Sequence, residues 1–404
     1  MAQKPTMGTP VLRRINTAAV LDAVRRSAPA PQRLTELVEL TGLTRPTVAQ
    51  AVGQLLESGW LLEHPPATSE PVGGRPATRV GLNARAAPVL GLDIGPHTVT
   101  AGVADLNGDP LAVVRRKAPH PDARHVLAQA DQAMADALAT ARTGASDIAA
   151  VVVATPGIVD ARTGRVVYAP SLPEWTSIDL AAHLKGTFAC PVAIENDANL
   201  AALADARTYS GKGTVLAVRW GERLGAGVII DGRLHRGAGA SGEIGFIPLP
   251  GKSVRHPDER PAKAEKNPRR SLEEEIGAEG IVRLAREYAA AHPRSKLHRA
   301  VGAADVFQAA EEGDTAAGAV VEYVIATLAQ ALGPALLVLC PDVVVVSGGV
   351  ARAGGVLAEA LKRHLVGMTL VPPRIDLSTS AENATLTGAF RMALDDVWVR
   401  RLSP

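Results

Sequence analysis

An amide and a carboxylate stand side by side at Asn196 and Asp197, directly after a short apolar run that is typical of a buried strand. An asparagine side chain donates and accepts hydrogen bonds and an ionised aspartate accepts them, which is the combination that sugar hydroxyl groups need in a cleft. Asn and Asp are also favoured at the start of a helix, so a structural role as a helix cap is the alternative. The residue types alone therefore fit either a sugar site or a helix cap at a strand-to-helix junction.

A second group of polar residues lies near the N-terminus, where Gly42 separates two short stretches with the apolar spacing of helices. Thr44, Arg45, Thr47 and Gln50 fall on the first turns of the second of these helices. Their hydroxyl, guanidinium and amide groups suit contacts with phosphates and base edges. This layout is typical of a helix-turn-helix whose second helix enters the major groove of DNA.

The segment that follows has the composition of two short strands at residues 61–63 and 78–82, and the turn between them carries Arg75. Such a hairpin is a wing, whose arginine can enter a narrow minor groove. Residues 1–85 contain 10 basic and 6 acidic side chains and the rest of the chain 33 and 35, so the basic excess is N-terminal. A basic dimerisation or scaffolding unit is the alternative, but the glycine turn, the wing and the charge agree on DNA binding.

The elements that position these residues follow from hydrophobic spacing. Three short helices and the hairpin predict a winged helix-turn-helix over residues 11–85, after a flexible N-terminus at residues 1–10. From residue 89, strands alternate with alanine-rich helices, which predicts an α/β domain over residues 86–404. The expected helices are 16–27, 34–41, 44–59, 123–143, 178–187, 196–207, 272–291, 303–312 and 314–339, and the expected strands of the α/β domain are 89–95, 98–105, 110–116, 148–154, 191–195, 214–219, 226–231 and 343–347.

The composition of the 404-residue chain excludes several classes of protein. With 47% hydrophobic and 21% charged residues and a net charge of +2, the chain is neither disordered nor uniformly basic. Only Cys190 and Cys340 are present, which excludes a disulfide framework and favours a reducing cytoplasm. The most apolar tract, residues 326–348, is interrupted by polar residues and prolines, so we expect a buried helix, a turn and a buried strand rather than a membrane span.

Six short motifs are spread over residues 93–350. They are Asp93-Ile94-Gly95, Pro156-Gly157, Glu195-Asn196-Asp197-Ala198-Asn199, Leu224-Gly225-Ala226-Gly227, Gly242-Glu243-Ile244-Gly245 and Ser347-Gly348-Gly349-Val350. Their order is that of the ROK family (repressor, open reading frame, kinase), which the chain resembles over nearly its whole length. The third and fifth motifs are the specific part of the match. With the winged helix in front, the chain resembles the regulators of that family.

The resemblance implies an actin-like, hexokinase-type fold of two lobes with a sugar in the cleft, usually assembled as a dimer or tetramer. In the kinases of the family, the aspartate that matches Asp197 is the base that takes a proton from the attacked hydroxyl. Residues that match Asn196, Glu243 and Glu273 hold sugar hydroxyls, and Gly157 belongs to the same site. Glu274 and Glu275 directly follow Glu273, so three consecutive carboxylates stand at this position of the motif order.

The two phosphate loops depart from the family pattern. The first should read Asp-Ile-Gly-Gly-Thr-Lys, but its fourth residue is Pro96, which has no N–H to donate. The second should read Gly-Thr-Gly-Ile-Gly, but Glu222 and Arg223 replace its second and third residues. Each lost charge-assisted hydrogen bond costs about 1.5–3 kcal/mol, so ATP binding should be weak. We expect no catalytic residue, with Asp197 only binding, although Arg223 facing an anion is the best case for a retained nucleotide site.

The structural zinc site of the family is also absent from the sequence. Family members usually follow the fifth motif with a histidine and a cysteine-rich loop. Here Phe246 takes the place of the histidine, Ser271 that of the last cysteine, and residues 251–270 contain no cysteine. We therefore predict no metal and no other cofactor.

Together these features predict a cytoplasmic, homo-oligomeric transcriptional repressor, either a homodimer or a homotetramer. We expect its winged helix to bind a double-stranded operator with an inverted repeat, and its two-lobed domain to bind a sugar or sugar-derivative effector. No membrane partner is expected. The break between the lobes is expected near residues 205–213, with the C-terminal helix returning to the first lobe. The alternative is an ATP-dependent sugar kinase that carries a DNA-binding domain, and a regulator with a vestigial cleft or a ligand other than a sugar is a third possibility.

Overall fold

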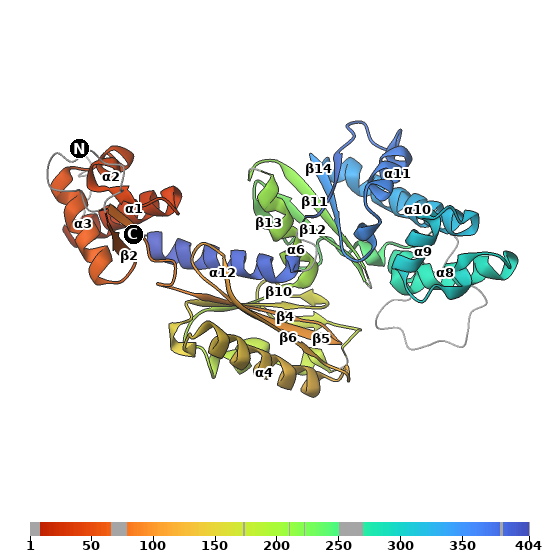
Figure 1. The fold of residues 1–404 in the computed structure, drawn as a ribbon, viewed down its shortest axis with the longest axis horizontal. Helices are drawn as coiled ribbons and strands as arrows, with labels where there is room; N and C mark the ends of the chain where they lie inside the picture. Colours follow the sequence, from red (N-terminus) through yellow and green to blue (C-terminus); the bar gives the residue numbers. More distant parts are fainter. Residues whose placement is uncertain are drawn as a thin grey trace.

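The computed structural model describes residues 9–65, 79–172, 174–209, 211–221, 223–249, 270–379 and 383–403. A small N-terminal head lies at one end of an elongated molecule, and two larger lobes follow (Figure 1). The last helix of the chain, α12 (Ala384–Leu402), runs along the first lobe and ends beside the head. This is the α/β architecture with an N-terminal helix-turn-helix that the sequence predicts.

The head is built from α1 (Thr9–Ser27), α2 (Leu34–Thr41) and α3 (Arg45–Glu57), with a three-stranded sheet in the order β1-β3-β2. Apolar residues spaced along one face of each helix form its core, including Val20, Leu37 and Val48, all fully buried. Gly42 ends α2 with a φ of 69°, a left-handed conformation that glycine adopts readily. The hairpin strands are β2 (Leu61–His64) and β3 (Arg79–Leu82).

Two features of the head differ from the sequence prediction. The first helix begins at Thr9 rather than near residue 16, and the two-residue strand β1 (Gln32–Arg33) pairs antiparallel with β3. A strand this short shows no alternation of polar and apolar residues, so periodicity cannot reveal it. The predicted wing residue Arg75 lies outside the described residues.

The first lobe contains a five-stranded sheet in the order β10-β7-β4-β5-β6. Strands β10, β7 and β4 run parallel to one another, whereas β5 and β6 pair antiparallel at one edge. Helix α4 (Ala123–Ala141) packs on β5 and β6, and α12 packs on β4 and β7. The strands are β4 (Val89–Ile94), β5 (Thr98–Ala104), β6 (Pro110–Lys117), β7 (Ala150–Thr155) and β10 (Val192–Asn196), and the short pair β8 (Ile158–Val159) and β9 (Val166–Tyr168) and helix α5 (Leu180–Lys185) complete the lobe.

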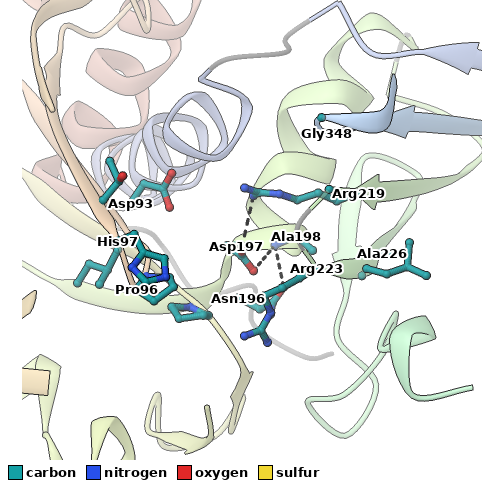
Figure 2. Close-up of a pocket in the computed structure, with 18 of the residues that line it drawn as sticks. Asp93, Pro96, His97, Asn196, Asp197, Ala198, Arg219, Arg223, Ala226 and Gly348 are labelled. Atoms are coloured by element: carbon teal, nitrogen blue, oxygen red, sulfur yellow. Dashed lines mark hydrogen bonds and ion pairs between the residues drawn. The ribbon is translucent and has the colours of Figure 1, made fainter. Parts of the chain in front are cut away.

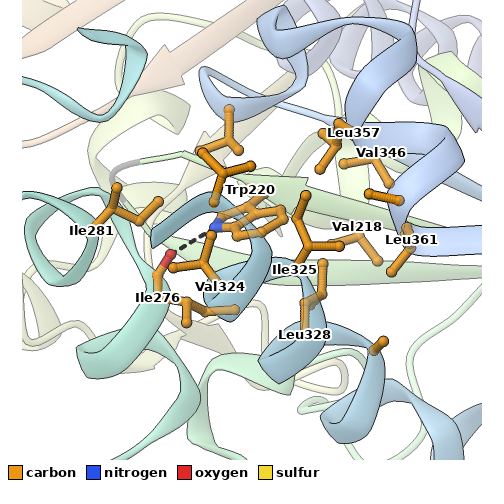
Figure 3. Packing of buried hydrophobic residues seen from close by; sticks show 14 of the residues in the cluster. Val218, Trp220, Ile276, Ile281, Val324, Ile325, Leu328, Val346, Leu357 and Leu361 are labelled. Atoms are coloured by element: carbon orange, nitrogen blue, oxygen red, sulfur yellow. Dashed lines mark hydrogen bonds between the residues drawn. The ribbon is translucent and has the colours of Figure 1, made fainter. Parts of the chain in front are cut away.

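The second lobe contains another five-stranded sheet, in the order β13-β12-β11-β14-β15. Its core surrounds Trp220, whose indole N–H donates to the carbonyl oxygen of Ile276 over 2.7 Å (Figure 3). The strands are β11 (Thr214–Trp220), β12 (Leu224–Ile230), β13 (Arg233–His235), β14 (Val343–Ser347) and β15 (Arg374–Leu377), and the helices are α7 (Leu272–Ile276), α8 (Ala278–Ala291), α9 (Ala303–Glu311), α10 (Thr315–Leu339) and α11 (Gly355–Leu365).

Helix α10 is the one helix among the described residues that is long and apolar enough to cross a membrane. It packs against α8, α9 and α11, and 61% of its most apolar window is buried inside the protein. It is thus a core helix of the second lobe, followed by a turn and the buried strand β14, as the sequence predicts. The single helix expected over residues 272–291 is instead divided at Gly277, which separates α7 from α8.

Helix α6 (Asp197–Asp205) lies between the two sheets. It contacts β11 and β12 of the second lobe, and it packs along most of its length against α12. Gly388 of α12 lies against the backbone of Leu200, where a Cβ atom would overlap the carbonyl oxygen. We take the boundary between the lobes to lie between α6 and β11.

Candidate functional site

A cleft of about 370 Å³ lies where the two lobes meet, at the carboxyl ends of β4, β10 and β11. The cleft is lined by Asn196, Asp197, Glu243 and Glu273, which lie up to 77 positions apart in the chain. Figure 2 shows Asn196 and Asp197 between the first-lobe loop at Pro96 and His97 and the second-lobe arginines. The fold thus gathers four of the five predicted ligand residues around one cavity.

Asn196 is both a helix cap and a lining residue. Its side-chain oxygen accepts hydrogen bonds from the backbone N–H groups of Ala198 (2.8 Å) and Asn199 (3.1 Å), which caps α6. Its side-chain nitrogen donates to the carbonyl oxygen of Gly157 over 2.8 Å. The oxygen has two lone pairs, and both are used. The nitrogen has two N–H groups and only one of them donates to Gly157, so the second remains for a ligand.

Gly157 supports the site rather than lining it. Its φ of 91° is a conformation that other residues rarely adopt, and a Cβ atom there would overlap the carbonyl oxygen of Tyr168. Only glycine fits this turn without displacement of the chain. Since its carbonyl accepts from Asn196, the turn fixes the orientation of the amide.

The first and last residues of the Glu-Asn-Asp-Ala-Asn motif stabilise its middle. Glu195 is buried, and one carboxylate oxygen accepts from the backbone N–H of Asn196 and the side chain of Asn199, each over 2.9 Å. The other oxygen accepts from Arg236 over 2.6 Å. The motif therefore contributes Asn196, Asp197 and Ala198 to the cleft, and its first and last residues support them.

Asp197 is engaged by the protein on both oxygens. Oδ1 accepts from the N–H of Ala198 over 2.9 Å, and Oδ2 lies 3.5 Å from a guanidinium nitrogen of Arg219. The same nitrogen of Arg219 donates to the hydroxyl of Thr385 over 2.6 Å. We did not predict Arg219 from the sequence, although a single arginine in an otherwise apolar strand directly before the second phosphate loop was a usable signal.

Glu243 and Glu273 bring two further carboxyl groups to the cleft. Burial, reinforced by the negative charges of Asp197 and Glu273, raises the pKa of Glu243 to about 7, while Arg223 acts in the opposite direction. One oxygen of Glu273 accepts from the backbone N–H of Leu224 over 2.9 Å, which leaves the other oxygen for a ligand. At neutral pH the Glu243 carboxyl is therefore poised between donating and accepting a hydrogen bond.

The three consecutive glutamates of α7 have different surroundings. Glu273 faces the cleft, whereas Glu274 forms a capping box with Ser271 at the start of the helix. Glu275 is buried and accepts from Arg270 (3.1 Å), Arg283 (2.8 Å) and the hydroxyl of Tyr323 (2.7 Å). Of the three side chains, only that of Glu273 lines the cleft, which favours Glu273 as the ligand residue.

The loops that would hold phosphates contain side chains of a different kind. Pro96 and His97 line the cleft on the first-lobe side, and Arg223 lines it on the second-lobe side, where it donates to the hydroxyl of Ser171. Burial raises the pKa of Asp93 to about 6, against the opposing effect of Arg219 and Arg115. Glu222, the other unusual residue of the second loop, lies outside the described residues.

The two described positions that would supply zinc ligands in the family do not fit that metal. Phe246 lines the cleft, and its ring lies 5.8 Å from that of Tyr168, so this position offers no metal-binding atom. The hydroxyl of Ser271 accepts from the N–H of Glu274 as a helix cap. Over the part of the chain that the structure describes, no group of three His, Cys, Asp or Glu side chains is arranged to hold a metal, and residues 251–269 lie outside that part.

The second helix of the helix-turn-helix presents the predicted polar residues outward. Thr44, Arg45 and Gln50 are exposed and Thr47 is half-buried, all on the first turns of α3. Thr44 occupies the cap position, but its hydroxyl is hydrogen-bonded to that of Thr47 over 2.8 Å instead of capping the backbone. The first N–H groups of α3 thus remain available to an anion such as a DNA phosphate.

These features define a class of protein, in which a helix-turn-helix head is joined to a two-lobed, sugar-kinase-type domain. The ROK family model matches residues 89–396 and the IclR helix-turn-helix domain model matches residues 15–65. The chain belongs to the ROK family.

The chain is similar to proteins named as glucokinases and to others named as xylose repressors. The chain is 31% identical over 250 residues to a glucokinase of Halalkalibacterium halodurans, covering 60% of this chain and 73% of the relative. It is 26% identical over 244 residues to the xylose repressor of Caldicellulosiruptor bescii, covering 59% and 60%. A solved ROK family transcriptional regulator, a homologue of the E. coli MLC protein, has the same fold, with a TM-score of 0.75, 20% identity and coverage of 97% and 99%.

Proposed function

We propose that this protein is a sugar-responsive transcriptional repressor that binds DNA through its head and an effector sugar in the cleft. The observation that carries this proposal is the convergence of Asn196, Asp197, Glu243 and Glu273 on one cavity in a chain that also exposes Thr44, Arg45 and Gln50 on α3. The relatives named as a glucokinase and a xylose repressor support a sugar as the ligand class.

Each group in the cleft has a specific role in this proposal. The remaining N–H of Asn196 donates to a hydroxyl oxygen of the sugar, whereas Asp197 and Glu273 accept from hydroxyl hydrogens. Glu243 does either, according to its protonation state. The ring of Phe246, which lines the cleft, packs against the apolar side of the sugar ring, and Gly157 keeps the amide of Asn196 in place.

The same geometry supports binding without phosphoryl transfer. Pro96 cannot donate an N–H to a phosphate, and Arg223 stands where the second loop of the kinases has a glycine. Phosphoryl transfer depends on groups that position and stabilise the phosphates, and these loops lack groups of that kind. We therefore infer that Asp197 binds a ligand but does not catalyse its phosphorylation.

The head contacts the major groove of DNA through Thr44, Arg45, Thr47 and Gln50. It contacts the minor groove through Arg75. We propose that the protein acts in the cytoplasm as a homodimer or homotetramer, because two symmetry-related heads read an inverted-repeat operator.

The experiment that tests this function is fluorescence anisotropy on duplex DNA from upstream of the protein's own gene, at two salt concentrations. Specific binding should survive scrambled competitor DNA and should change when D-glucose, D-xylose or another sugar of a panel is added. Failure to bind any upstream fragment specifically would overturn the DNA-binding role. Specific binding that no sugar alters would overturn the effector role.

The competing function is an ATP-dependent sugar kinase, and the observation in its favour is that Asp197 keeps the position of the catalytic base. ADP release measured with the same sugars at high ATP decides between the two. Sugar-dependent ADP release that disappears in Asp197→Asn would establish the kinase, and no release above the sugar-free rate would support the repressor.

A further inference from the structure

The hydroxyl of Thr385 connects an arginine of the cleft to the helix that reaches the DNA-binding head. Thr385 is the second residue of α12, is buried, and accepts the 2.6 Å hydrogen bond from Arg219. Arg219 lies in the cleft 3.5 Å from Asp197 (Figure 2). One guanidinium group therefore joins a ligand-binding carboxylate to the start of α12.

The opposite end of α12 lies against the head. The rings of Trp398 and Trp60 are 5.9 Å apart, and Trp60 directly precedes β2. The guanidinium of Arg25, on α1, lies 5.2 Å from the Trp398 ring, and that of Arg401 lies 4.6 Å from the Trp60 ring. These aromatic and cation–π contacts fix the head to the last turns of the helix.

Between its two ends, α12 is held along α6, whose first residue is Asp197. Gly388 lets the two backbones approach closely at Leu200, and Arg391 donates to the carbonyl oxygen of Leu203 over 2.7 Å. These contacts brace α12 along its length, so we infer that a shift at its start is passed on to its other end.

We propose that Arg219, Thr385 and α12 form the connection through which sugar binding in the cleft changes the position of the DNA-binding head. This inference rests on the proposed function. A sugar hydroxyl that donates to Asp197 Oδ2 competes with Arg219 for the same oxygen. Arg219 then changes its position, its bond to Thr385 changes, and the Trp60–Trp398 contact transmits the movement of α12 to α1 and the wing strands.

The test uses Thr385→Val in the full-length protein, because valine keeps the shape of threonine but cannot accept the hydrogen bond. Thr385 does not line the cleft. The matched control is Thr387→Val on the same helix, whose hydroxyl makes no hydrogen bond within the described part of the chain. Trp398→Leu removes the contact with the head at the other end.

Operator affinity is measured with and without each sugar of the panel, and sugar affinity is measured separately by calorimetry. If the effector sugar changes operator affinity at least 5-fold in the wild type and in Thr387→Val, we expect a change below 2-fold in Thr385→Val and Trp398→Leu. Sugar affinity should stay within about 3-fold of wild type in all three variants. A normal response in Thr385→Val would overturn the proposal, as would sugar affinity lost in parallel with the response.

Hydrogen exchange of the protein without sugar tests the connection between the two ends of α12 separately. This test does not depend on finding the effector sugar or on the proposed function. Thr385→Val should raise exchange both at the start of α12 and around Trp60, whereas Thr387→Val should not. Exchange around Trp60 that stays at the wild-type level, with the start of α12 loosened, would show that the two ends are not connected.

Discussion

The side-chain amide of Asn196 donates to the carbonyl oxygen of Gly157 over 2.8 Å, while the oxygen of the same amide caps α6. The side chain that we propose to bind the sugar is thereby held between a helix start and a turn that only glycine fits. The turn and the ligand site should consequently respond together to substitution.

Gly157→Ala should destabilise the protein by more than 1 kcal/mol and abolish the sugar response, because the new Cβ overlaps the carbonyl oxygen of Tyr168 and displaces the partner of Asn196. Gly164→Ala is the matched control, since Gly164 also has a positive φ, of 67°, but no atom within 4 Å of its Cβ position. Urea unfolding and sugar titration measure both effects. Equal behaviour of the two variants would contradict a role for Gly157 in the site.

The pH dependence of sugar binding should report on Glu243, whose pKa burial raises to about 7. Since a carboxylate accepts sugar hydroxyl hydrogens better than a carboxylic acid, affinity for the effector sugar should rise between pH 6 and pH 8. The rise should disappear in Glu243→Gln and persist in Glu311→Gln, an exposed position on α9. Calorimetry at three pH values tests this, and an unchanged profile in Glu243→Gln would refute it.

Stability without ligand should change with pH in the opposite sense. The ordinary pKa of a glutamate is about 4.5 and the folded value of Glu243 is about 7, so the folded state binds more protons than the unfolded chain between these values. The free energy of unfolding should therefore fall as pH rises from 4.5 to 7. Denaturant titrations of wild type and Glu243→Gln should differ in this window, the variant showing the smaller decrease.

Operator binding should depend on the exposed start of α3. Arg45→Ala and Gln50→Ala should each weaken specific binding by about 1–3 kcal/mol, because a bidentate contact to a base is worth that much. Arg75→Ala should weaken binding most for operators with a narrow minor groove. Arg124→Ala, an exposed arginine on α4 of the first lobe, is the charge-matched control. An intact oligomer with full operator affinity in Arg45→Ala and Arg75→Ala would remove the assignment of the head.

The consecutive glutamates of α7 should give three different results when each is replaced by alanine. Glu275→Ala should lower the free energy of unfolding by about 3 kcal/mol, because it leaves Arg270 and Arg283 without their buried partner. Glu274→Ala should cost about 1 kcal/mol through loss of the capping box. Glu273→Ala should also cost about 1 kcal/mol, through loss of the hydrogen bond from the N–H of Leu224, but unlike Glu274→Ala it should weaken sugar binding. Denaturant unfolding and calorimetry on the three variants measure the pattern, which a uniform loss of stability would contradict.

The sequence by itself determined the class of fold, the helix-turn-helix head and the family, because each depends on local patterns. Apolar spacing marked the helices and strands, Gly42 marked the turn between α2 and α3, and the Glu-Asn-Asp-Ala-Asn block lay at a strand-to-helix junction. It also placed Asn196, Asp197, Glu243 and Glu273 in a common site through their resemblance to known motifs. Where a pattern was too short to have a period, as at β1, the prediction failed.

Only the tertiary structure decided which side chains meet. Glu195 accepts hydrogen bonds from Asn196 and Asn199 and so holds the motif in place. Gly157 accepts from the amide of Asn196 through its carbonyl oxygen. Glu273 rather than Glu275 lines the cleft. Arg219 and Thr385 are 166 residues apart and belong to different lobes. Their contact exists because the C-terminal helix returns across the first sheet and begins beside the end of β11. Such a contact is fixed by the packing of whole elements, which no local spacing of residues encodes.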